Sequence, residues 1–148
     1  MTPDPEPVFN QAWVGVADGP LSAPVLGRVV GMLAARADCP IDRLDDALLV
    51  ADAVAAKAGL FSDDGRIRAQ IIARRGSVEL QVGPLRGGGA DQLIASAALP
   101  GVGNLLERVA DELQSQESDD DDEEYLLIRL DFDAQHPPFI DRMESDVT

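Results

Sequence analysis

The sequence predicts an α+β fold, a two-layer sandwich in which helices cover one face of a mostly antiparallel sheet. Two observations lead to this prediction. Two helix-patterned segments follow one another near the N-terminus, and β-patterned runs, two of them arranged as a hairpin, come later in the chain. The 148 residues are enough for one domain, which we place at residues 8–133, between a Pro-rich acidic arm at 1–7 and a polar tail at 134–148.

The first part of this domain is expected to be a strand followed by a helix. Residues 8–19 contain a short β-patterned run around Trp13 to Val16, and we expect Trp13 to fill an edge of the core. Apolar residues then recur at helical spacing, which predicts a helix over residues 21–38 with one apolar stripe. The stripe consists of Leu21, Val25, Val29, Met32 and Leu33.

A second helix is predicted over residues 39–59, beginning with Pro40 and stopping at Gly59. Its first turn carries acidic residues and its last turn carries a lysine, an arrangement that the helix dipole favours. The apolar face of this helix is expected to comprise Ile41, Leu44, Leu48, Ala51 and Ala55.

The second half of the domain begins with a hairpin of two strands, at residues 66–75 and 77–83. Apolar residues at helical spacing then predict a helix over residues 103–114 that packs on the sheet. The acidic run at residues 117–124 is expected to be a solvated loop, followed by a last strand over residues 125–133. The residues that pack the predicted helix on the sheet are Leu105, Leu106, Val109 and Leu113.

The composition argues against several function classes. The chain has 27 acidic and 12 basic residues, and its formal net charge of −15 at pH 7 opposes binding to nucleic acid or to an anionic membrane. The lone Cys39 allows no internal disulfide, and the first residues do not resemble a signal peptide, so we expect a cytoplasmic protein. Aromatic residues make up only 4% of the chain, which predicts a core of Ala, Val, Leu and Ile.

Four segments carry a resemblance to a known family. They are the helix pair, the hairpin, the stretch "LPGVGNLLERVADEL" at residues 99–113 and the closing "YLLIRLDF" at residues 125–132. In this order and spacing they resemble the anti-sigma regulatory factors of bacteria, which are small relatives of the histidine-kinase and Hsp90-type ATPase domains. The resemblance covers residues 14–133. It implies a two-layer sandwich in which ATP lies between helices and sheet, held by a helix motif with a Glu and an Asn and by two glycine motifs.

Within this resemblance, the residues that would bind magnesium and adenine are missing. Active relatives carry a Glu on the second long helix and an Asn one turn later, and this chain has Asp52 and Ala56 at these positions. The resemblance therefore implies that Asp52 faces the nucleotide cleft while the Mg²⁺ ligand is lost. The strand that would end in an adenine-binding Asp ends at Gly83 and Pro84, so the main polar contact for selecting adenine is absent as well.

Two glycine-rich segments could still bind phosphate. Gly101 and Gly103 precede the last predicted helix, so their amides, Asn104 and the helix N-terminus could form an anion site. The cluster at residues 87–89 could also bring bare backbone amides toward an anion, with Arg86 supplying positive charge. Both segments are also typical of ordinary turns and surface loops.

We therefore expect a regulatory protein that has kept the frame of an ATP site, has lost its magnesium and adenine contacts, and acts by binding a protein. The resemblance implies a sigma factor, an anti-sigma antagonist or a second copy of the chain as the partner. One alternative is an active ATP-dependent serine kinase, with Asp52 as the base and Gly101, Gly103 and Asn104 holding phosphates. Another is a structural domain with no nucleotide role. No metal site is expected, because the acidic residues 119–122 lack the spacing of a calcium loop.

Overall fold

The computed structural model of the protein describes residues 8–119 and 122–132. The arm predicted at residues 1–7 and the tail predicted at 134–148 lie outside these described residues. In chain order, the elements are β1 (Val8–Ala17), α1 (Ser22–Arg36), α2 (Ile41–Lys57), the 3-10 helix η1 (Ala58–Phe61), β2 (Arg66–Arg74), β3 (Ser77–Arg86), α3 (Gly89–Ser96), β4 (Ala98–Leu99), β5 (Gly103–Asn104), α4 (Leu105–Val109), β6 (Glu112–Glu117) and β7 (Glu123–Asp131).

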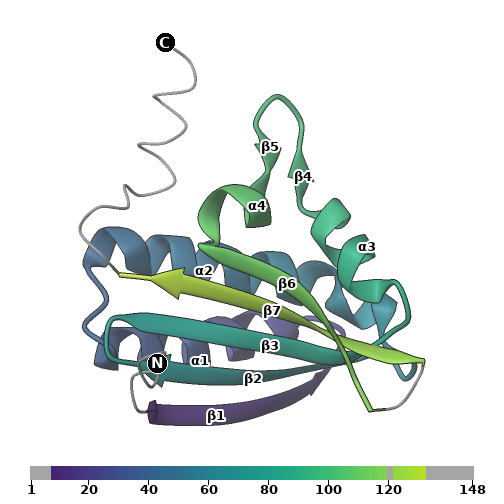
Figure 1. Cartoon of the computed structure of the whole chain (residues 1–148), viewed down its shortest axis with the longest axis horizontal. Helices are drawn as coiled ribbons and strands as arrows, with labels where there is room; N and C mark the ends of the chain where they lie inside the picture. Colours follow the sequence, from purple (N-terminus) through teal and green to yellow (C-terminus); the bar gives the residue numbers. More distant parts are fainter. Residues whose placement is uncertain (1–7, 120–121, 133–148) are drawn as a thin grey trace, which may run out of the picture.

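The fold is an antiparallel sheet with helices packed on one face, as the sequence predicts (Figure 1). Five strands lie in the order β1-β2-β3-β7-β6, and each pairs antiparallel with its neighbours. The predicted hairpin is β2–β3, joined at Arg75 and Gly76, and the predicted last strand is β7, which lies between β3 and β6. The strands β1 and β6 are therefore the two edges of the sheet.

An aliphatic core fills the space between the sheet and the helices, as the low aromatic content predicts. Along β2, side chains alternate between this core and the opposite face of the sheet. Fully buried side chains include Leu26 and Val30 from α1, Val50 and Val54 from α2, and Ile71, Leu80 and Ile128 from the sheet. In the described part of the chain, α1 and α2 both lie behind the sheet, which leaves its other face uncovered (Figure 1).

The apolar stripe predicted for α1 is wrong for most of its members. The buried residues of this helix are Ser22, Leu26, Val30, Leu33 and Ala34. Of the predicted stripe only Leu33 is buried, and the half-buried Val29 packs against the edge of the core. The exposed members are Leu21, Val25 and Met32, at 65%, 37% and 57%. Both flanks of α1 are apolar, so periodicity alone does not decide which of them packs on the sheet.

The buried face of α2 also differs from the predicted one. Its buried residues are Arg43, Asp46, Ala47, Val50, Ala51, Val54 and Ala55. Ala51 and Ala55 belong to the predicted face, whereas Ile41 is 80% exposed. The difference arises because the buried face contains an ion pair, Arg43 with Asp46, which a search for apolar periodicity does not detect.

Arg43 ties the start of α2 to the last two strands of the sheet. Its guanidinium donates to Oδ2 of Asp46 and to Oδ2 of Asp111, each at 2.7 Å, and to the carbonyl of Asp131 at 3.2 Å. Oδ2 of Asp111 also accepts a hydrogen bond from the backbone N–H of Asp131 at 2.7 Å. All three charged side chains are buried or nearly so, and the one positive charge of Arg43 lies between two negative charges inside the protein.

The helix predicted over residues 103–114 is wrong beyond Val109. α4 is little more than one turn long, and the edge strand β6 follows it. The N–H of Asp111 donates to the carbonyl of Arg129 at 2.8 Å, which begins the pairing of β6 with β7. Leu113 packs against the core from this strand, so its spacing from Val109 matches a helix without belonging to one.

Two further segments differ from the prediction. Residues 89–96, for which the sequence predicts no element, form α3. The solvated loop predicted at residues 117–124 is shorter, because its two ends belong to strands: Glu117 ends β6 and lies opposite Glu124 of β7.

Candidate functional site

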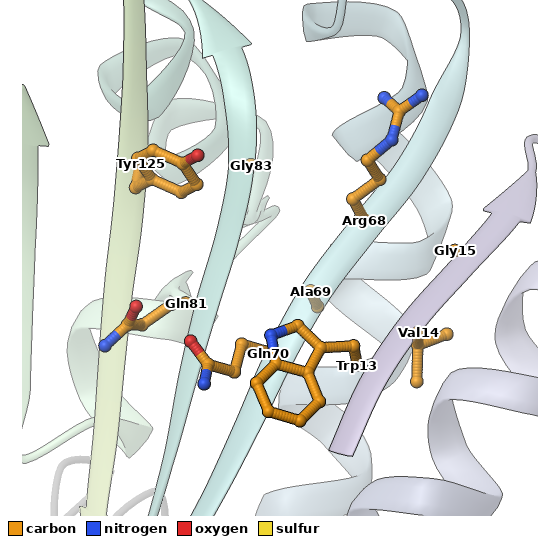
Figure 2. A pocket seen from close by; sticks show the side chains of 9 residues that line it. All are labelled: Trp13, Val14, Gly15, Arg68, Ala69, Gln70, Gln81, Gly83 and Tyr125. Carbon is orange, nitrogen blue, oxygen red and sulfur yellow. The ribbon is translucent and has the colours of Figure 1, made fainter. Parts of the chain in front are cut away.

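A trough on the uncovered face of the sheet is the first candidate site. It has a volume of about 420 Å³ and lies across β1, β2, β3 and β7. Figure 2 shows Trp13 and Tyr125 on its two sides, with Gln70 and Gln81 between them. The lining residues of this open-face trough are Trp13, Val14, Gly15, Arg68, Ala69, Gln70, Gln81, Gly83 and Tyr125.

Strand register brings three of these side chains into one row. Trp13 lies opposite Gln70 in the β1–β2 pair, and Gln70 lies opposite Gln81 in the β2–β3 pair. Residues directly opposite each other on antiparallel strands share a face of the sheet. The row therefore runs across the open face, and Leu127 lies opposite Gln81 in β7. Tyr125 lies two residues before Leu127 on the same strand, beside Gly83 (Figure 2).

Two glycines make room for the trough. Gly15 lies opposite Arg68, and a Cβ placed on it would meet no atom within 4 Å. A Cβ on Gly83 would lie 2.8 Å from Cδ1 of Tyr125. The missing side chain at Gly83 therefore lets the Tyr125 ring lie against β3, and the missing one at Gly15 leaves the space beside Arg68 open.

The two glutamines present hydrogen-bonding groups on the floor of the trough. Nε2 of Gln70 donates to Oε1 of Gln11 at 3.4 Å, and Nε2 of Gln81 donates to Oε2 of Glu79 at 3.3 Å. Within the described residues, Oε1 of Gln70 and Oε1 of Gln81 accept no hydrogen bond from the protein. These oxygens can accept hydrogen bonds from a ligand, for example from peptide N–H groups.

Arg68 brings a positive charge to the trough, but a neighbouring acid neutralises it. Its Nη1 donates to Oδ1 of Asp64 at 3.0 Å, and its Nη2 bonds the other oxygen of that carboxylate. The hydrogen bond from Arg68 lowers the pKa of Asp64 to about 2, so this acid is ionised throughout the physiological pH range. The trough thus presents aromatic rings, amides and one paired charge.

The prediction that Trp13 fills an edge of the core is wrong, because its side chain is 68% exposed. The strand pattern contains the signal that could have corrected it. Ala12, Val14 and Val16 all pack on the core side, so Trp13 at the alternate position points to the other face. Local sequence does not show, however, that Tyr125 lies on the same face two strands away.

A smaller cleft lies beside Asp52, on the helical side of the sheet. Its volume is about 280 Å³. The lining residues are Leu49, Asp52, Ala53, Ala56, Lys57, Ser96, Ala97, Leu99 and Leu105. Asp52 and Ala56, the pair that the resemblance selects, both line this cleft, and Lys57 supplies the cation in its lining. The structure does not bring Gly83 to it, because Gly83 lines the trough on the other face.

In the second glycine motif, the side chain of Asn104 is hydrogen-bonded within the protein. Gly101 and Gly103 lie in the β4–β5 hairpin, with φ angles of +75° and +110°. Oδ1 of Asn104 accepts from the N–H of Glu107 at 3.1 Å, which caps α4, and its Nδ2 donates to the carbonyl of Ile94 at 2.6 Å. Asn104 thus links α4 to α3 by hydrogen bonds. None of the three motif residues lines the smaller cleft.

In the glycine cluster at residues 87–89, one backbone amide has a partner in the protein, and so does the amide that follows the cluster. The N–H of Gly87 donates to the carbonyl of Asp122 at 2.9 Å. The N–H of Ala90, in the first turn of α3, donates to Oε1 of Glu124 at 2.7 Å. A carboxylate of the protein therefore occupies the place that a bound anion would take at the start of this helix.

The described residues contain no group of three or more His, Cys, Asp or Glu side chains that could hold a metal ion. Over the same ranges, no helix is long and apolar enough to span a membrane. A comparison with protein-family models gives no match for this chain, and a comparison with curated proteins gives none either.

Proposed function

We propose that the protein is a non-catalytic binding domain that regulates a partner protein by holding a segment of it in the open-face trough. One observation carries the proposal: the exposed Trp13 and the half-buried Tyr125 lie on the two sides of a hollow of about 420 Å³ (Figure 2). Tryptophan and tyrosine are the residues that most often dominate binding energy at protein interfaces. Ligand sites typically measure about 300–1,000 Å³, a range that includes the trough.

The chemistry of the trough fits an uncharged, extended protein segment. The amide oxygens of Gln70 and Gln81 can accept from peptide N–H groups, and the aromatic rings can pack on proline or aliphatic side chains. Arg68 is already paired with Asp64, so a strongly charged ligand would meet little free counter-charge in the trough. The net charge of −15 further disfavours acidic ligands.

The lining residues support binding rather than catalysis. They include no His, Cys, Ser, Asp or Glu, which are the side chains that most often serve as nucleophile or general base. The hydroxyl in this lining is that of Tyr125, and no carboxylate or imidazole of the lining stands beside it to take its proton.

We retain one expectation from the anti-sigma resemblance, namely that the protein acts by binding a partner protein. A sigma factor or an anti-sigma antagonist would be a partner of this kind, and regulation would follow from occupying the partner rather than from ATP hydrolysis. The resemblance supports this partner class, and the trough supports the mode of binding.

Peptide selection tests the proposal. Random peptides of about 12 residues, displayed on phage, would be selected on the full chain, and the binders would be labelled with fluorescein and titrated by anisotropy. We expect micromolar dissociation constants, and a loss of affinity of about tenfold or more in Trp13→Ala and in Tyr125→Ala. Ile41→Ala is the matched control, because Ile41 is 80% exposed on α2, outside the trough.

Two outcomes would contradict this proposal. One is a selection that yields no binder. The other is a set of peptides that bind Trp13→Ala, Tyr125→Ala and the parent chain with equal affinity. Circular dichroism checks that the variants are folded, which we expect for Trp13→Ala because truncating an exposed side chain changes stability by only about 0.5 kcal/mol.

The cleft beside Asp52 favours a second candidate function, nucleotide binding. The resemblance would place ATP beside Asp52, but the cleft is smaller than typical ligand sites, mostly apolar, and lined by the single cation Lys57. A fluorescent ATP analogue titrated with and without Mg²⁺ separates the two functions. We expect no saturable binding. Micromolar, Mg²⁺-dependent binding would instead support the serine kinase alternative with Asp52 as its base.

A further inference from the structure

The chain itself contains a segment of the kind that the open-face trough accepts. Residues 134–140, AQHPPFI, include two prolines, a phenylalanine and an isoleucine, and no Asp, Glu, Lys or Arg. We call them the tail segment; an acid lies at each end of it, at Asp133 and Asp141. Consecutive prolines favour an extended backbone, which lowers the entropy that a peptide loses when it binds a groove lined by aromatic residues. The tail segment therefore has the charge and the side-chain types that the trough fits.

The other stretches outside the described residues have a different composition. Residues 1–7, MTPDPEP, have two acids among the prolines, and residues 120–121 are both aspartate. Residues 141–148 contain three acids and one arginine. A further acid is unfavourable in a protein with a net charge of −15, and the one cation that lines the trough, Arg68, is already paired. Among these stretches, the tail segment is thus the one that matches the trough.

The described part of the chain ends at Phe132, close to the trough. The N–H of Phe132 donates to the carbonyl of Gly76 at 2.8 Å, so β7 ends against the turn between β2 and β3. Leu127, five residues earlier, lies opposite Gln81 of the trough. About 16 Å of strand therefore separates the end of β7 from the nearer side of the trough.

The tail segment is long enough to cover this distance. Phe139 is the seventh residue after Phe132. If two residues reverse the direction of the chain, the other five span about 16 Å, which brings Phe139 level with Gln81. The Trp13 ring lies beside Gln70, on the strand next to that of Gln81 (Figure 2). Phe139 and the residue after it can therefore reach the Trp13 ring.

Arg74 has an unused hydrogen-bond donor between the end of β7 and the trough. It shares the open face of β2 with Gln70, four residues away, and pairs with Ser77 at the turn. Its Nη1 lies 3.7 Å from Oε2 of Glu79, and its Nε is buried without a hydrogen-bond partner among the described residues. A buried donor without a partner is unfavourable, and a carbonyl oxygen of a segment that crosses this face would satisfy it.

We infer that the tail segment turns back over the open face and occupies the trough of its own chain. Phe139 and Ile140 pack beside the Trp13 ring, and the glutamine oxygens of the trough accept hydrogen bonds from backbone N–H groups of the segment. A partner protein then has to displace the tail segment before it can bind. This inference rests on the proposed function, in which the trough holds a protein segment.

Acrylamide quenching of fluorescence tests the inference in the full chain, because Trp13 is its single tryptophan. Phe139→Ser with Ile140→Ser removes two apolar side chains of the tail segment, and Met143→Ser with Val147→Ser is the matched control beyond it. We expect the first pair to raise the quenching constant about twofold or more, because the Trp13 ring loses its cover in most molecules. The control pair should leave the constant unchanged.

Binding of a peptide copy of the tail segment is the second measurement. The peptide DAQHPPFID, residues 133–141, would be labelled with fluorescein and titrated by anisotropy. A segment joined to its site by a few residues acts at an effective concentration in the millimolar range, so it competes with the free peptide. We expect the Phe139→Ser, Ile140→Ser chain to bind the peptide about tenfold or more tightly than the parent chain or the control pair. Adding Trp13→Ala should abolish this gain.

Equal quenching of the parent chain and the Phe139→Ser, Ile140→Ser variant would overturn the inference, and so would equal affinity for the labelled peptide. Protection of Trp13 that grows between about 1 and 100 μM protein would also overturn it, because the segment would then come from another copy. Circular dichroism confirms that each variant is folded. If peptides selected by display bind through Trp13 while the tail substitutions change nothing, this inference fails and the proposed function stands.

Discussion

Arg43 is a buried cation shared by two carboxylates, those of Asp46 and Asp111. Breaking a buried ion pair by removing one partner costs about 3–5 kcal/mol, because the remaining charge loses its compensation. We expect Arg43→Ala to lower the free energy of unfolding by this amount in urea denaturation. Arg28→Ala, at an exposed position of α1, is the control and should change it by less than about 0.5 kcal/mol. Equal effects of the two substitutions would refute the role given to Arg43.

Cys39 is a partly buried thiol in the short connection between α1 and α2. Burial raises its pKa to about 12; Arg43 nearby lowers it and Asp46 raises it by smaller amounts. The folded protein should therefore react with a thiol reagent at pH 8 about a hundredfold or more slowly than the urea-unfolded chain, because the thiolate is the reactive form. Equal rates would contradict the burial of this thiol. Between pH 9 and 12 only the unfolded thiol loses its proton, so the thiol's contribution to stability falls as pH rises through this window.

At the scale of elements, the β4–β5 hairpin depends on two glycines with positive φ. A left-handed conformation costs an alanine residue about 1–2 kcal/mol. Gly101→Ala and Gly103→Ala should therefore each lower the free energy of unfolding by roughly that amount. Gly27→Ala is the control with the opposite sign, because Gly27 lies inside α1 and its Cβ would meet no atom within 4 Å. It should stabilise the protein by about 0.5–1 kcal/mol. Hairpin variants as stable as the parent in urea would contradict the strain assigned to them.

Local sequence patterns predicted which helices and strands form better than they predicted which faces of these elements are buried. The two long helices, the hairpin and the last strand follow from periodicity and turn residues, and all are present. The buried flank of α1 was missed because both flanks are apolar, and only the contact of Gly31 with α2 distinguishes them. The end of α4 was missed because the extended path after Val109 depends on pairing with β7, a strand that comes later in the chain.

The candidate site was predictable only in part, for a similar reason. Asp52 and Ala56 line the smaller cleft, and their role beside a nucleotide stays a prediction. The open-face trough draws its residues from β1, β2, β3 and β7, and these four strands become neighbours only through the order of the whole sheet. Alternation within β1 predicts that the Trp13 side chain points away from the core, but no local pattern places it near Tyr125.

The whole molecule carries its two candidate sites on opposite faces of one sheet. The open-face trough lies on the uncovered face, and the smaller cleft beside Asp52 lies on the helical side. The two sites share no lining residue, so a substitution in one of them tests that site alone.

An NMR titration can show whether the open-face trough holds a protein segment. A selected peptide would be added to ¹⁵N-labelled protein, following the backbone amides together with the Trp13 indole N–H and the side-chain amides of Gln70 and Gln81. We expect saturable chemical-shift changes that concentrate on these three side chains and on the trough strands β1, β2, β3 and β7. Shifts confined to the cleft around Asp52, with the Trp13 indole signal unmoved, would contradict it.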